Sequence, residues 1–262
     1  MNGLEFMLQG KSRNGAGAAL ITGGGRRIGA AIARTLAGAG FSVVLHANRS
    51  RGEAEALAGE IEAAGGLAHV VLADLADAEA LAGLVQAAAA FAPLTLLVNN
   101  ASVFDEDEIG SLTRAQFDAT MAVNLTAPLF LAQAFAAQAT AGADASIVNI
   151  VDQRVLRPTP KFFSYTLSKS ALDLATTTLA QALAPLRVNA VAPGPVLPSP
   201  RQTPAQFAAQ AASVPLGRGP APQDIADTVL YLAGARSVTG VTVAVDGGQH
   251  LAWRTPDSDM AE

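Results

Sequence analysis

The feature that most constrains the fold is a regular alternation of short apolar runs with longer amphipathic stretches. Seven runs have the length and β-branched content of strands, and six stretches between them carry Ala and Leu at helical spacing. The alternation predicts right-handed βαβ units, and therefore a doubly wound α/β domain with a seven-stranded parallel sheet flanked by helices. The predicted strands are Ala18–Thr22, Phe41–Ala47, Ala68–Leu75, Leu94–Asn99, Ala145–Asp152, Leu186–Ala192 and Val241–Val245. The predicted helices are Ile28–Ala39, Glu53–Ala64, Asp77–Phe91, Arg114–Ala139, Phe163–Ala184 and Gln223–Ala233.

No Pro-, Ser- or Gly-rich linker interrupts this alternation, and no repeat of solenoid period occurs. We therefore expect one domain over residues 15–250, with an N-terminal extension over residues 1–14 and a C-terminal tail over residues 251–262. The proline-rich stretch from Pro195 to Pro215 follows the sixth predicted strand, at the sheet edge where substrate lids lie. It predicts a lid loop, with an inert surface loop as the alternative.

Composition excludes several classes of function. The net charge of −5 and the pI near 5.2 disfavour a nucleic-acid partner. The absence of cysteine excludes disulfides and cysteine-ligated metals, and the three histidines are too scattered to predict a metal site. The apolar stretch Ala87–Leu97 is broken by Pro93, and residues 1–13 lack the apolar core of a secretory signal. We expect a cytoplasmic protein that binds a small molecule, without a membrane partner.

A glycine-rich turn, TGGGRRIG over residues 22–29, joins the first predicted strand to the first predicted helix. Glycines let a phosphate approach the backbone, and the helix N-terminus offers free N–H groups and a positive dipole. A glycine cluster alone is often a simple turn, but its place between a strand and a helix supports a Rossmann-like dinucleotide site. Gly23, Arg27 and Ile28 are its candidate cofactor contacts.

The end of the second predicted strand indicates which dinucleotide binds. An NAD site usually places an acid there for the ribose 2′-hydroxyl, whereas this strand ends in His46, Ala47, Asn48, Arg49 and Ser50. Guanidinium groups match phosphate oxygens, so Arg49 together with Arg27 could bracket a 2′-phosphate, with Ser50 as a further donor. Two solvated arginines are the alternative. The sequence predicts NADP(H), with His46 and Asn48 in the same cofactor loop.

Two more predicted strands end in polar residues at the same edge of the sheet. Asp74 and Leu75 follow the third strand, and Asn100, Ala101 and Ser102 follow the fourth. All five are candidate cofactor contacts: Asp74 could accept from an adenine amino group, and Asn100 could stabilise the central strands. Taken singly, such residues are more often loop caps.

Tyr165 and Lys169 lie four residues apart on a predicted helix and therefore project from one face. An ammonium beside a phenol favours the phenolate, so we expect Lys169 to lower the pKa of Tyr165 and to make it a proton-exchanging group. A surface pair is the alternative, although the chain has only two tyrosines.

With these motifs in order, the chain resembles the short-chain dehydrogenase/reductase family over nearly its whole length. The resemblance rests on the glycine turn, Asn99-Asn100-Ala101, Asn124, Tyr165-x-x-x-Lys169, VNAVAPG over residues 188–194 and VDGG over residues 245–248. It implies that Tyr165 donates the proton, that Lys169 holds the nicotinamide ribose, and that Asn124 supports a water leading to Lys169. It also implies cofactor contacts at Pro193, Gly194 and Val196, and assembly as a homotetramer, with Trp253 at an interface or on the surface.

One member of the family's usual set is replaced. Thirteen residues before the tyrosine the family has a serine that donates to a substrate carbonyl, and this chain has Asp152. An ionised aspartate would oppose a developing alkoxide, so reduction of an ordinary ketone should suffer. Reduction of a C=N bond needs a proton at nitrogen, which a protonated Asp152 or an Asp152–Tyr165 pair could supply.

This replacement also resembles the pteridine reductase and dihydromonapterin reductase branch of the family, together with Arg27, the stretch His46–Ser50 and the stretch Asn100–Phe104. The resemblance implies that Phe104 stacks on a pterin, that Ser102 and Arg27 hydrogen-bond to it, and that Asp152 and Tyr165 deliver protons. A core-edge hydrophobe is the alternative for Phe104. The acidic run from Asp105 to Glu108 is expected to be a solvated loop.

The sequence therefore predicts an NADPH-dependent reductase that transfers hydride to a C=N bond of a pterin of the dihydromonapterin or dihydrobiopterin type. The catalytic residues would be Asn124, Asp152, Tyr165 and Lys169. A ketone, carbonyl or quinone reductase of the same family is the alternative. A non-catalytic NADPH-binding regulatory protein is a minor one, since Asn124, Tyr165 and Lys169 are all retained.

Overall fold

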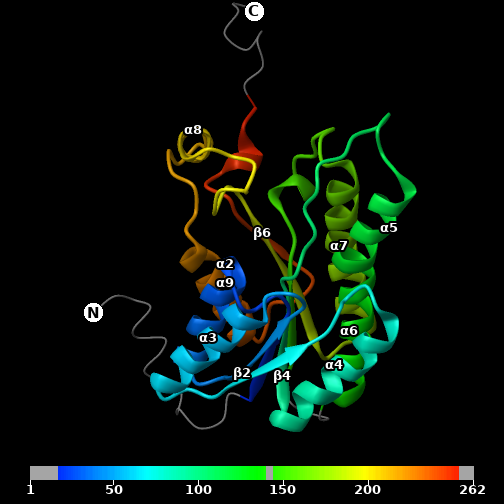
Figure 1. The fold of residues 1–262 in the computed structure, drawn as a ribbon, viewed down its shortest axis with the longest axis vertical. Helices are drawn as coiled ribbons and strands as arrows, with labels where there is room; N and C mark the ends of the chain where they lie inside the picture. Colours follow the sequence, from blue (N-terminus) through cyan, green and yellow to red (C-terminus); the bar gives the residue numbers. More distant parts are fainter. Residues whose placement is uncertain (1–16, 140–143, 254–262) are drawn as a thin grey trace, which may run out of the picture.

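The computed structural model describes residues 17–139 and 144–253, so the expected N-terminal extension and nearly all of the expected tail lie outside the described residues. Within them, seven parallel strands form one sheet in the order β3-β2-β1-β4-β5-β6-β7 (Figure 1). This confirms the predicted doubly wound sheet. The strands are β1 Ala18–Ile21, β2 Ser42–Ala47, β3 Ala68–Leu72, β4 Leu94–Asn99, β5 Ser146–Ile150, β6 Arg187–Pro193 and β7 Thr242–Val245.

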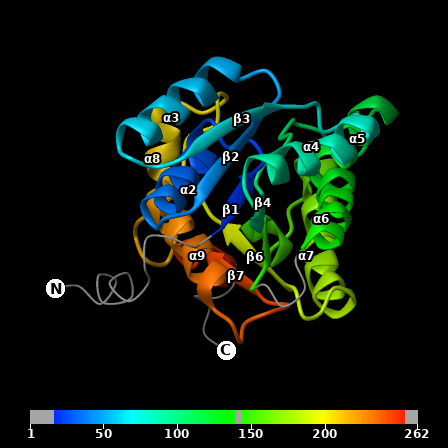
Figure 2. The same ribbon diagram turned by 90° about the horizontal axis from the view of Figure 1, so that it is seen from below.

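Helices cover both faces of the sheet, one set on each side (Figure 2). One face carries α2 Arg27–Gly38, α3 Arg51–Ala63 and α9 Pro222–Gly234. The other carries α4 Ala78–Phe91, α5 Arg114–Met121, α6 Ala127–Gln138 and α7 Phe163–Ala182. Each face packs into its own apolar core, as right-handed crossovers from a parallel sheet require.

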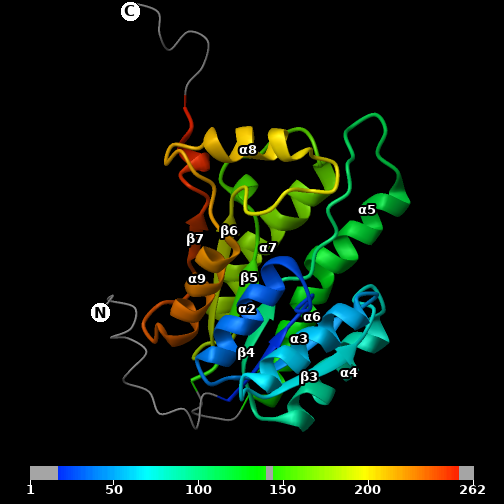
Figure 3. The same cartoon turned by 60° about the vertical axis from the view of Figure 1, so that its left-hand side comes forward.

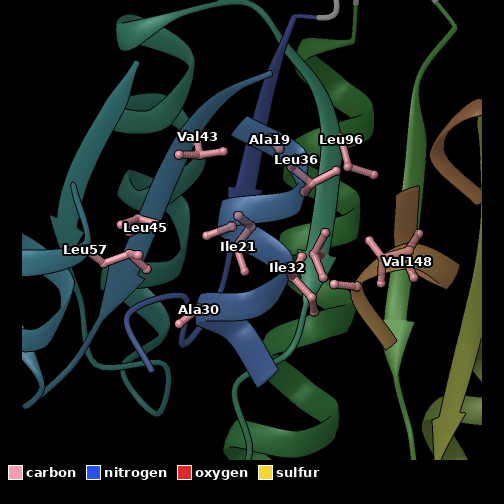
Figure 4. Packing of buried hydrophobic residues seen from close by; sticks show 14 of the residues in the cluster. Ala19, Ile21, Ala30, Ile32, Leu36, Val43, Leu45, Leu57, Leu96 and Val148 are labelled. Carbon is pink, nitrogen blue, oxygen red and sulfur yellow. The ribbon is translucent and has the colours of Figure 1, made fainter. Parts of the chain in front are cut away.

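Alternate residues of each strand point to opposite cores. Ala19 and Ile21 of β1 face Ile32 and Leu36 of α2, together with Val43 of β2 (Figure 4). The intervening residues of β1 belong to the core beneath α4 and α6. Because the central strands are buried on both faces, they appear in the sequence as continuous apolar runs.

The helix expected over Arg114–Ala139 is interrupted. A five-residue π-helical turn, Ala122–Thr126, separates α5 from α6 and contains the buried Asn124. Such π-turns occur often at functional sites. By length and hydropathy alone Arg114–Gln138 could cross a membrane. In this fold one side of α6 belongs to the apolar core, since Leu131, Ala132 and Phe135 are fully buried.

The stretch expected to be a lid loop contains a helix. Thr203 and Gln206 form a capping box, and α8 (Pro204–Ala212) begins there. The prolines around this start favour a loop by sequence, and the Thr-x-x-Gln spacing is the signal that could have predicted the helix. Figure 3 shows α8 lying across the carboxyl end of the sheet, above α7. The expected lid position therefore holds a helix carried on two loops.

Candidate active site

The glycine turn after β1 has the backbone of a phosphate-binding loop. Gly23 has φ +62, and a Cβ at Gly29 would lie 2.2 Å from the carbonyl oxygen of Gly23. Only glycine allows the first turn of α2 to pack so closely on this loop. Asn100 Nδ2 donates to the carbonyl oxygens of Thr22 and Gly23 at 2.9 and 3.2 Å, which ties the loop to the end of β4. Asn100 thereby joins the ends of two central strands, and the helix N-terminus beside the loop is open to a phosphate.

His46 supports the loop from beneath. Its side chain is 2% exposed; Nδ1 accepts from the backbone N–H of Gly23 at 3.2 Å, and Nε2 lies 3.1 Å from the carbonyl oxygen of Ala73. Burial lowers the pKa of His46. Since both ring nitrogens are engaged by the backbone, His46 shapes the cofactor loop, and its imidazole has no nitrogen left for a cofactor.

Two arginines lie at this side of the site in different settings. Arg49 is exposed beside Asn48 and makes no ion pair within the described residues, whereas Ser50 stands at the start of α3. Arg27 reaches in the other direction: its two terminal nitrogens each donate to the carbonyl oxygen of Pro198 at 3.1 Å. The structure therefore connects Arg27 to the lid and leaves Arg49 open to a phosphate.

The remaining cofactor candidates lie where strands end at the same edge of the sheet. Asp74 Oδ1 accepts from the N–H of Ala76, so Asp74 caps its own loop, the alternative to an adenine contact. The Asp74 side chain stays exposed. Gly194 packs against Asp246 so closely that a Cβ would lie 2.6 Å from the Asp246 Cα. Leu75 and Val196 are buried, Ala101 and Ile28 are half-buried, and Pro193 ends β6.

The catalytic candidates meet at the ends of β5 and α7. Tyr165 Oη donates to Asp152 Oδ2 at 2.9 Å, and Lys169 Nζ donates to the carbonyl oxygen of Ile150 at 2.7 Å. Lys169 is 2% exposed, and its Nζ lies 5.9 Å from the centroid of the Tyr165 ring. The spacing of four residues therefore places Tyr165 and Lys169 in one buried cluster with Asp152.

The electrostatics correct one expectation. Burial, followed by the nearby Asp152 carboxylate, raises the pKa of Tyr165 well above its ordinary value. Burial also lowers the pKa of Lys169 to about 8 and raises the pKa of Asp152. The expected lowering of the Tyr165 pKa by Lys169 does not occur, because Lys169 donates to a backbone carbonyl and burial dominates. The pair Asp152–Tyr165 therefore holds its protons tightly.

Asn124 joins three elements around this pair. Its Nδ2 donates to Ser168 Oγ at 3.1 Å and to the carbonyl oxygen of Val103 at 2.9 Å, and its Oδ1 accepts from the N–H of Val103. Ser102 Oγ also lies 3.3 Å from Oδ1. Asn124 thus fixes the loop after β4 against α7 at Ser168, the residue before Lys169.

Phe104 lies in an aromatic cluster that sequence reasoning only partly anticipated. Its ring stacks on Phe162 at 4.3 Å and meets Tyr165 edge-on at 4.6 Å. Arg201 of the lid donates to the carbonyl oxygen of Phe104 at 2.7 Å, and its guanidinium lies over both phenylalanines. Phe162, in the left-handed region at φ 55, was missed because nothing in its spacing links it to residue 104.

The acidic run is not wholly solvated, contrary to expectation. Asp107 is 7% exposed, and its carboxylate oxygens lie 3.1 and 3.3 Å from the N–H of Ser164. Its backbone carbonyl oxygen accepts from the N–H of Phe163. Asp107 therefore caps the start of α7 from another loop, one residue before the candidate catalytic residue Tyr165. No local pattern reveals a cap supplied by a residue so distant in the chain.

We expect Asp107→Ala to destabilise the fold by about 1–2 kcal/mol, the usual cost of losing a helix cap. Turnover should fall as well, because Tyr165 lies in the first turn that Asp107 holds. Urea unfolding and kcat check both effects. Asp107→Asn, which keeps an acceptor oxygen, should recover most of each loss, and the exposed Glu108→Ala serves as the control. Equal stability in the Asp107→Ala and Glu108→Ala variants would contradict the capping role.

Within the described parts of the chain, no group of three or more His, Asp or Glu side chains is arranged to hold a metal ion.

Comparison with known proteins is consistent with this geometry. Residues 23–250 match a family described as "Enoyl-(Acyl carrier protein) reductase". The chain is 50% identical to the FolM alternative dihydrofolate reductase 1 from Brucella canis, solved in complex with NADP, with a TM-score of 0.90 over 96% of this chain and 100% of that one. It is 36% identical to L-xylulose reductase from Bos taurus, over 88% of this chain and 95% of the relative. It is 32% identical to pteridine reductase 1 from Leishmania tarentolae, over 89% of this chain and 96% of the relative.

Proposed function

The chain belongs to the short-chain dehydrogenase/reductase family and is an NADP(H)-dependent oxidoreductase, and on that premise we propose that it reduces a C=N bond in the ring of a pterin such as dihydromonapterin or dihydrobiopterin. The observation that carries the proposal is the hydrogen bond from Tyr165 to Asp152. An acid stands where an ordinary carbonyl reductase has a serine, and it is bonded to the proton donor.

Ketones and C=N compounds differ in the atom that lies beside Asp152, which is an oxygen in a ketone and a nitrogen in a C=N bond. A ketone becomes an alkoxide during reduction, and Asp152 opposes that negative charge whenever it is ionised. A C=N bond becomes an amine, whose nitrogen needs a proton that an acid can supply. Burial raises the pKa of Asp152, which favours the protonated acid that such a reaction uses.

The residues divide the work as follows. When bound, NADPH supplies the hydride that reaches the carbon of the C=N bond. In the structure the Tyr165 hydroxyl donates to Asp152, so the bond reverses for the step: Tyr165 turns its proton to the nitrogen, and a protonated Asp152 then donates across the same 2.9 Å contact and replaces that proton. Burial, the largest cause of the raised pKa of Tyr165, disfavours a lasting phenolate, so a proton passed on from Asp152 would stabilise the site after the transfer.

The platform for the heterocycle would be Phe104, with its second face already supported by Phe162. A flat bicyclic ring gains from stacking on such a surface. Ser102 and Arg27 would hydrogen-bond to the ring edge. Arg27 keeps its Nε free of hydrogen bonds to the described residues while its terminal nitrogens bind the lid, so it could join the substrate to the closed lid.

The cradle fits NADPH by its own chemistry. The glycine turn and the first turn of α2 would hold the pyrophosphate, with Gly23 and Ile28 nearest to it. Arg49, Ser50 and Asn48 would take the 2′-phosphate, and Asp74 and Leu75 the adenine. The nicotinamide end would lie among Asn100, Ala101, Ser102, Pro193, Gly194 and Val196, with Lys169 and Tyr165 at the ribose.

We expect Arg49→Gln to lower kcat/KM for NADPH by roughly 10- to 100-fold, the cost of losing charge-assisted hydrogen bonds to a phosphate. The value for NADH should change little, because NADH lacks that phosphate. Arg51→Gln is a matched control, since Arg51 is exposed two residues away and pairs with Glu55. An unchanged NADPH-to-NADH ratio in Arg49→Gln would remove the basis for this phosphate site.

The runner-up function is reduction of a ketone, carbonyl or quinone, and the relationship to L-xylulose reductase is the observation that favours it. A non-catalytic NADPH-binding role is weakened by the intact cluster of Asn124, Tyr165 and Lys169.

A substrate panel separates these functions. Purified enzyme with NADPH is offered dihydromonapterin, dihydrobiopterin, L-xylulose and a simple quinone, and loss of NADPH absorbance is followed. The proposal expects turnover of the dihydropterins with the highest kcat/KM. Turnover of the sugar or quinone alone would leave the family and cofactor in place and reject the pterin.

We also propose a cytoplasmic homotetramer. Large apolar side chains on α6 and α7 are exposed in the single chain, among them Phe130, Leu167 and Leu174. Trp253 is 73% exposed near the C-terminus and is a candidate for the same kind of contact. Light scattering on the purified protein tests the assembly.

A further inference from the structure

Arg154, which the sequence did not single out, lies inside the catalytic cluster. It follows β5 in a short 3-10 turn, Gln153–Val155, for which Asp152 is the N-terminal cap. The backbone N–H of Arg154 donates to Asp152 Oδ1 at 2.8 Å, and its Nη1 lies 3.4 Å from Asp152 Oδ2. Asp152 therefore accepts hydrogen bonds from Arg154 on both carboxyl oxygens and from the Tyr165 hydroxyl on one of them.

The guanidinium is held in a largely desolvated position. The side chains of Arg154 and Asp152 are only 19% and 18% exposed. The guanidinium carbon lies 5.4, 5.3 and 5.9 Å from the ring centroids of Phe104, Phe162 and Tyr165. Charges interact more strongly where water is excluded, so this cation acts on its neighbours far more than a surface arginine would.

Asp152 is the acid that Arg154 pairs with, and no second carboxylate competes for it. Across residues 17–139 and 144–253, Asp152 is the single salt-bridge partner of Arg154, and Arg154 Nε is buried without a hydrogen-bond partner. Two other titratable groups near Asp152 come from α7: Tyr165, which is bonded to it, and Lys169, which donates to Ile150. Arg201 of the lid lies 5.3 Å from the centroid of the Phe104 ring. His250 lies on the 3-10 turn Gln249–Leu251 that packs against the Arg154 turn, and its Nδ1 is 2.7 Å from Asp246 Oδ2.

We propose that Arg154 is a positioning residue that orients the Asp152 carboxyl group toward Tyr165 and stabilises the carboxylate that remains after the pair has delivered its proton to the substrate. The role rests on the proposed function, in which Asp152 restores the proton that Tyr165 gives away. Before the step Asp152 is neutral; after it the carboxylate is negative and faces the fixed positive charge of Arg154. The proton lost is regained from solvent before the next turnover.

The balance of charges sets the direction of the effect. Burial raises the pKa of Asp152, and the Arg154 charge and backbone N–H oppose that rise. Without the guanidinium, Asp152 should keep its proton to higher pH and release it less readily. A residue that serves only to pack the aromatic cluster would not move the titration of Asp152.

The test is a titration of the Asp152 carboxyl group in the cofactor-free enzyme, by carbon-13 NMR of protein labelled at aspartate. Asp152→Asn assigns the signal. We expect Arg154→Met to raise the midpoint by roughly one to three pH units, the usual effect of losing an opposite charge at this range. Arg154→Lys should return it most of the way, and Arg157→Met, on the exposed side of the same segment, should leave it unchanged.

Arg154→Gln provides a second neutral variant in case Arg154→Met folds poorly, and far-ultraviolet circular dichroism checks each protein. A midpoint in both neutral variants equal to that of the wild type would overturn the proposal. In turnover, kcat should fall more than KM rises, and the pH at which kcat declines should move upward in the neutral variants. If the wild type turns over no dihydropterin, the proposed function fails, while the titration still decides what Arg154 does to Asp152.

Discussion

Tyr165→Phe should lower kcat by about 10²–10⁴-fold while leaving NADPH affinity nearly unchanged. The hydroxyl is the group that reaches Asp152, and no other hydroxyl donates to that carboxylate within the described residues. The phenyl ring keeps its edge-on contact with Phe104, so the aromatic cluster should survive the change. Steady-state rates with dihydropterin and fluorescence titration with NADPH measure the two effects.

The matched control for this variant is Tyr231→Phe. Tyr231 is the only other tyrosine of the chain and is 53% exposed on α9, on the opposite face of the sheet from α7. Its loss should leave both measurements unchanged. Retention of more than about a tenth of the wild-type kcat in Tyr165→Phe would mean that another group delivers the proton.

Asp152→Ser should shift the preference of the enzyme from dihydropterin toward a ketone. We expect kcat/KM for dihydropterin to fall by roughly 10²-fold, the value of a well-placed general acid, and kcat/KM for a ketone to rise. The serine restores a neutral donor to a carbonyl oxygen and removes the charge that opposes an alkoxide. The ratio of the two kcat/KM values, measured on one preparation, is the readout.

The pH dependence of the wild type should reflect the same residue. Burial raises the pKa of Asp152, so the protonated form is present below that pKa and the rate with dihydropterin falls as pH rises through it. Asp152→Ser should lose this limb of the profile. Asp118→Ser, at an exposed ion pair on α5, should keep it. A ratio of substrates that is the same in Asp152→Ser and Asp118→Ser would count against the proton relay.

The sheet was predictable from the sequence because its strands are buried on both faces. Val43 and Val44 of β2 face different cores, and both must be apolar, so the run stands out against the helices around it. The boundaries were less certain: β3 ends at Leu72, before the predicted Leu75, because Asp74 begins a turn by accepting from Ala76.

The site was predictable where its residues follow a local rule. Tyr165 and Lys169 share a helix face by spacing alone, and Asn100 follows a strand end. Asp107, Arg154 and Phe162 lie beyond such rules, because each acquires its role from a partner brought near by the fold. The direction of the Tyr165 pKa shift was also beyond the sequence, since burial and the neighbouring Asp152 carboxylate raise it.

The central claim, hydride transfer to a pterin C=N bond, is tested most directly by tracing the hydride in a competition. The enzyme receives equal amounts of dihydromonapterin and L-xylulose with NADPH deuterated at both C4 positions, and the products are examined by NMR and mass spectrometry. We expect deuterium on the pterin ring carbon of the former C=N bond, with the added proton at nitrogen taken from solvent. Deuterium mainly on the carbinol carbon of the sugar alcohol would contradict the claim and assign the enzyme to carbonyl reduction.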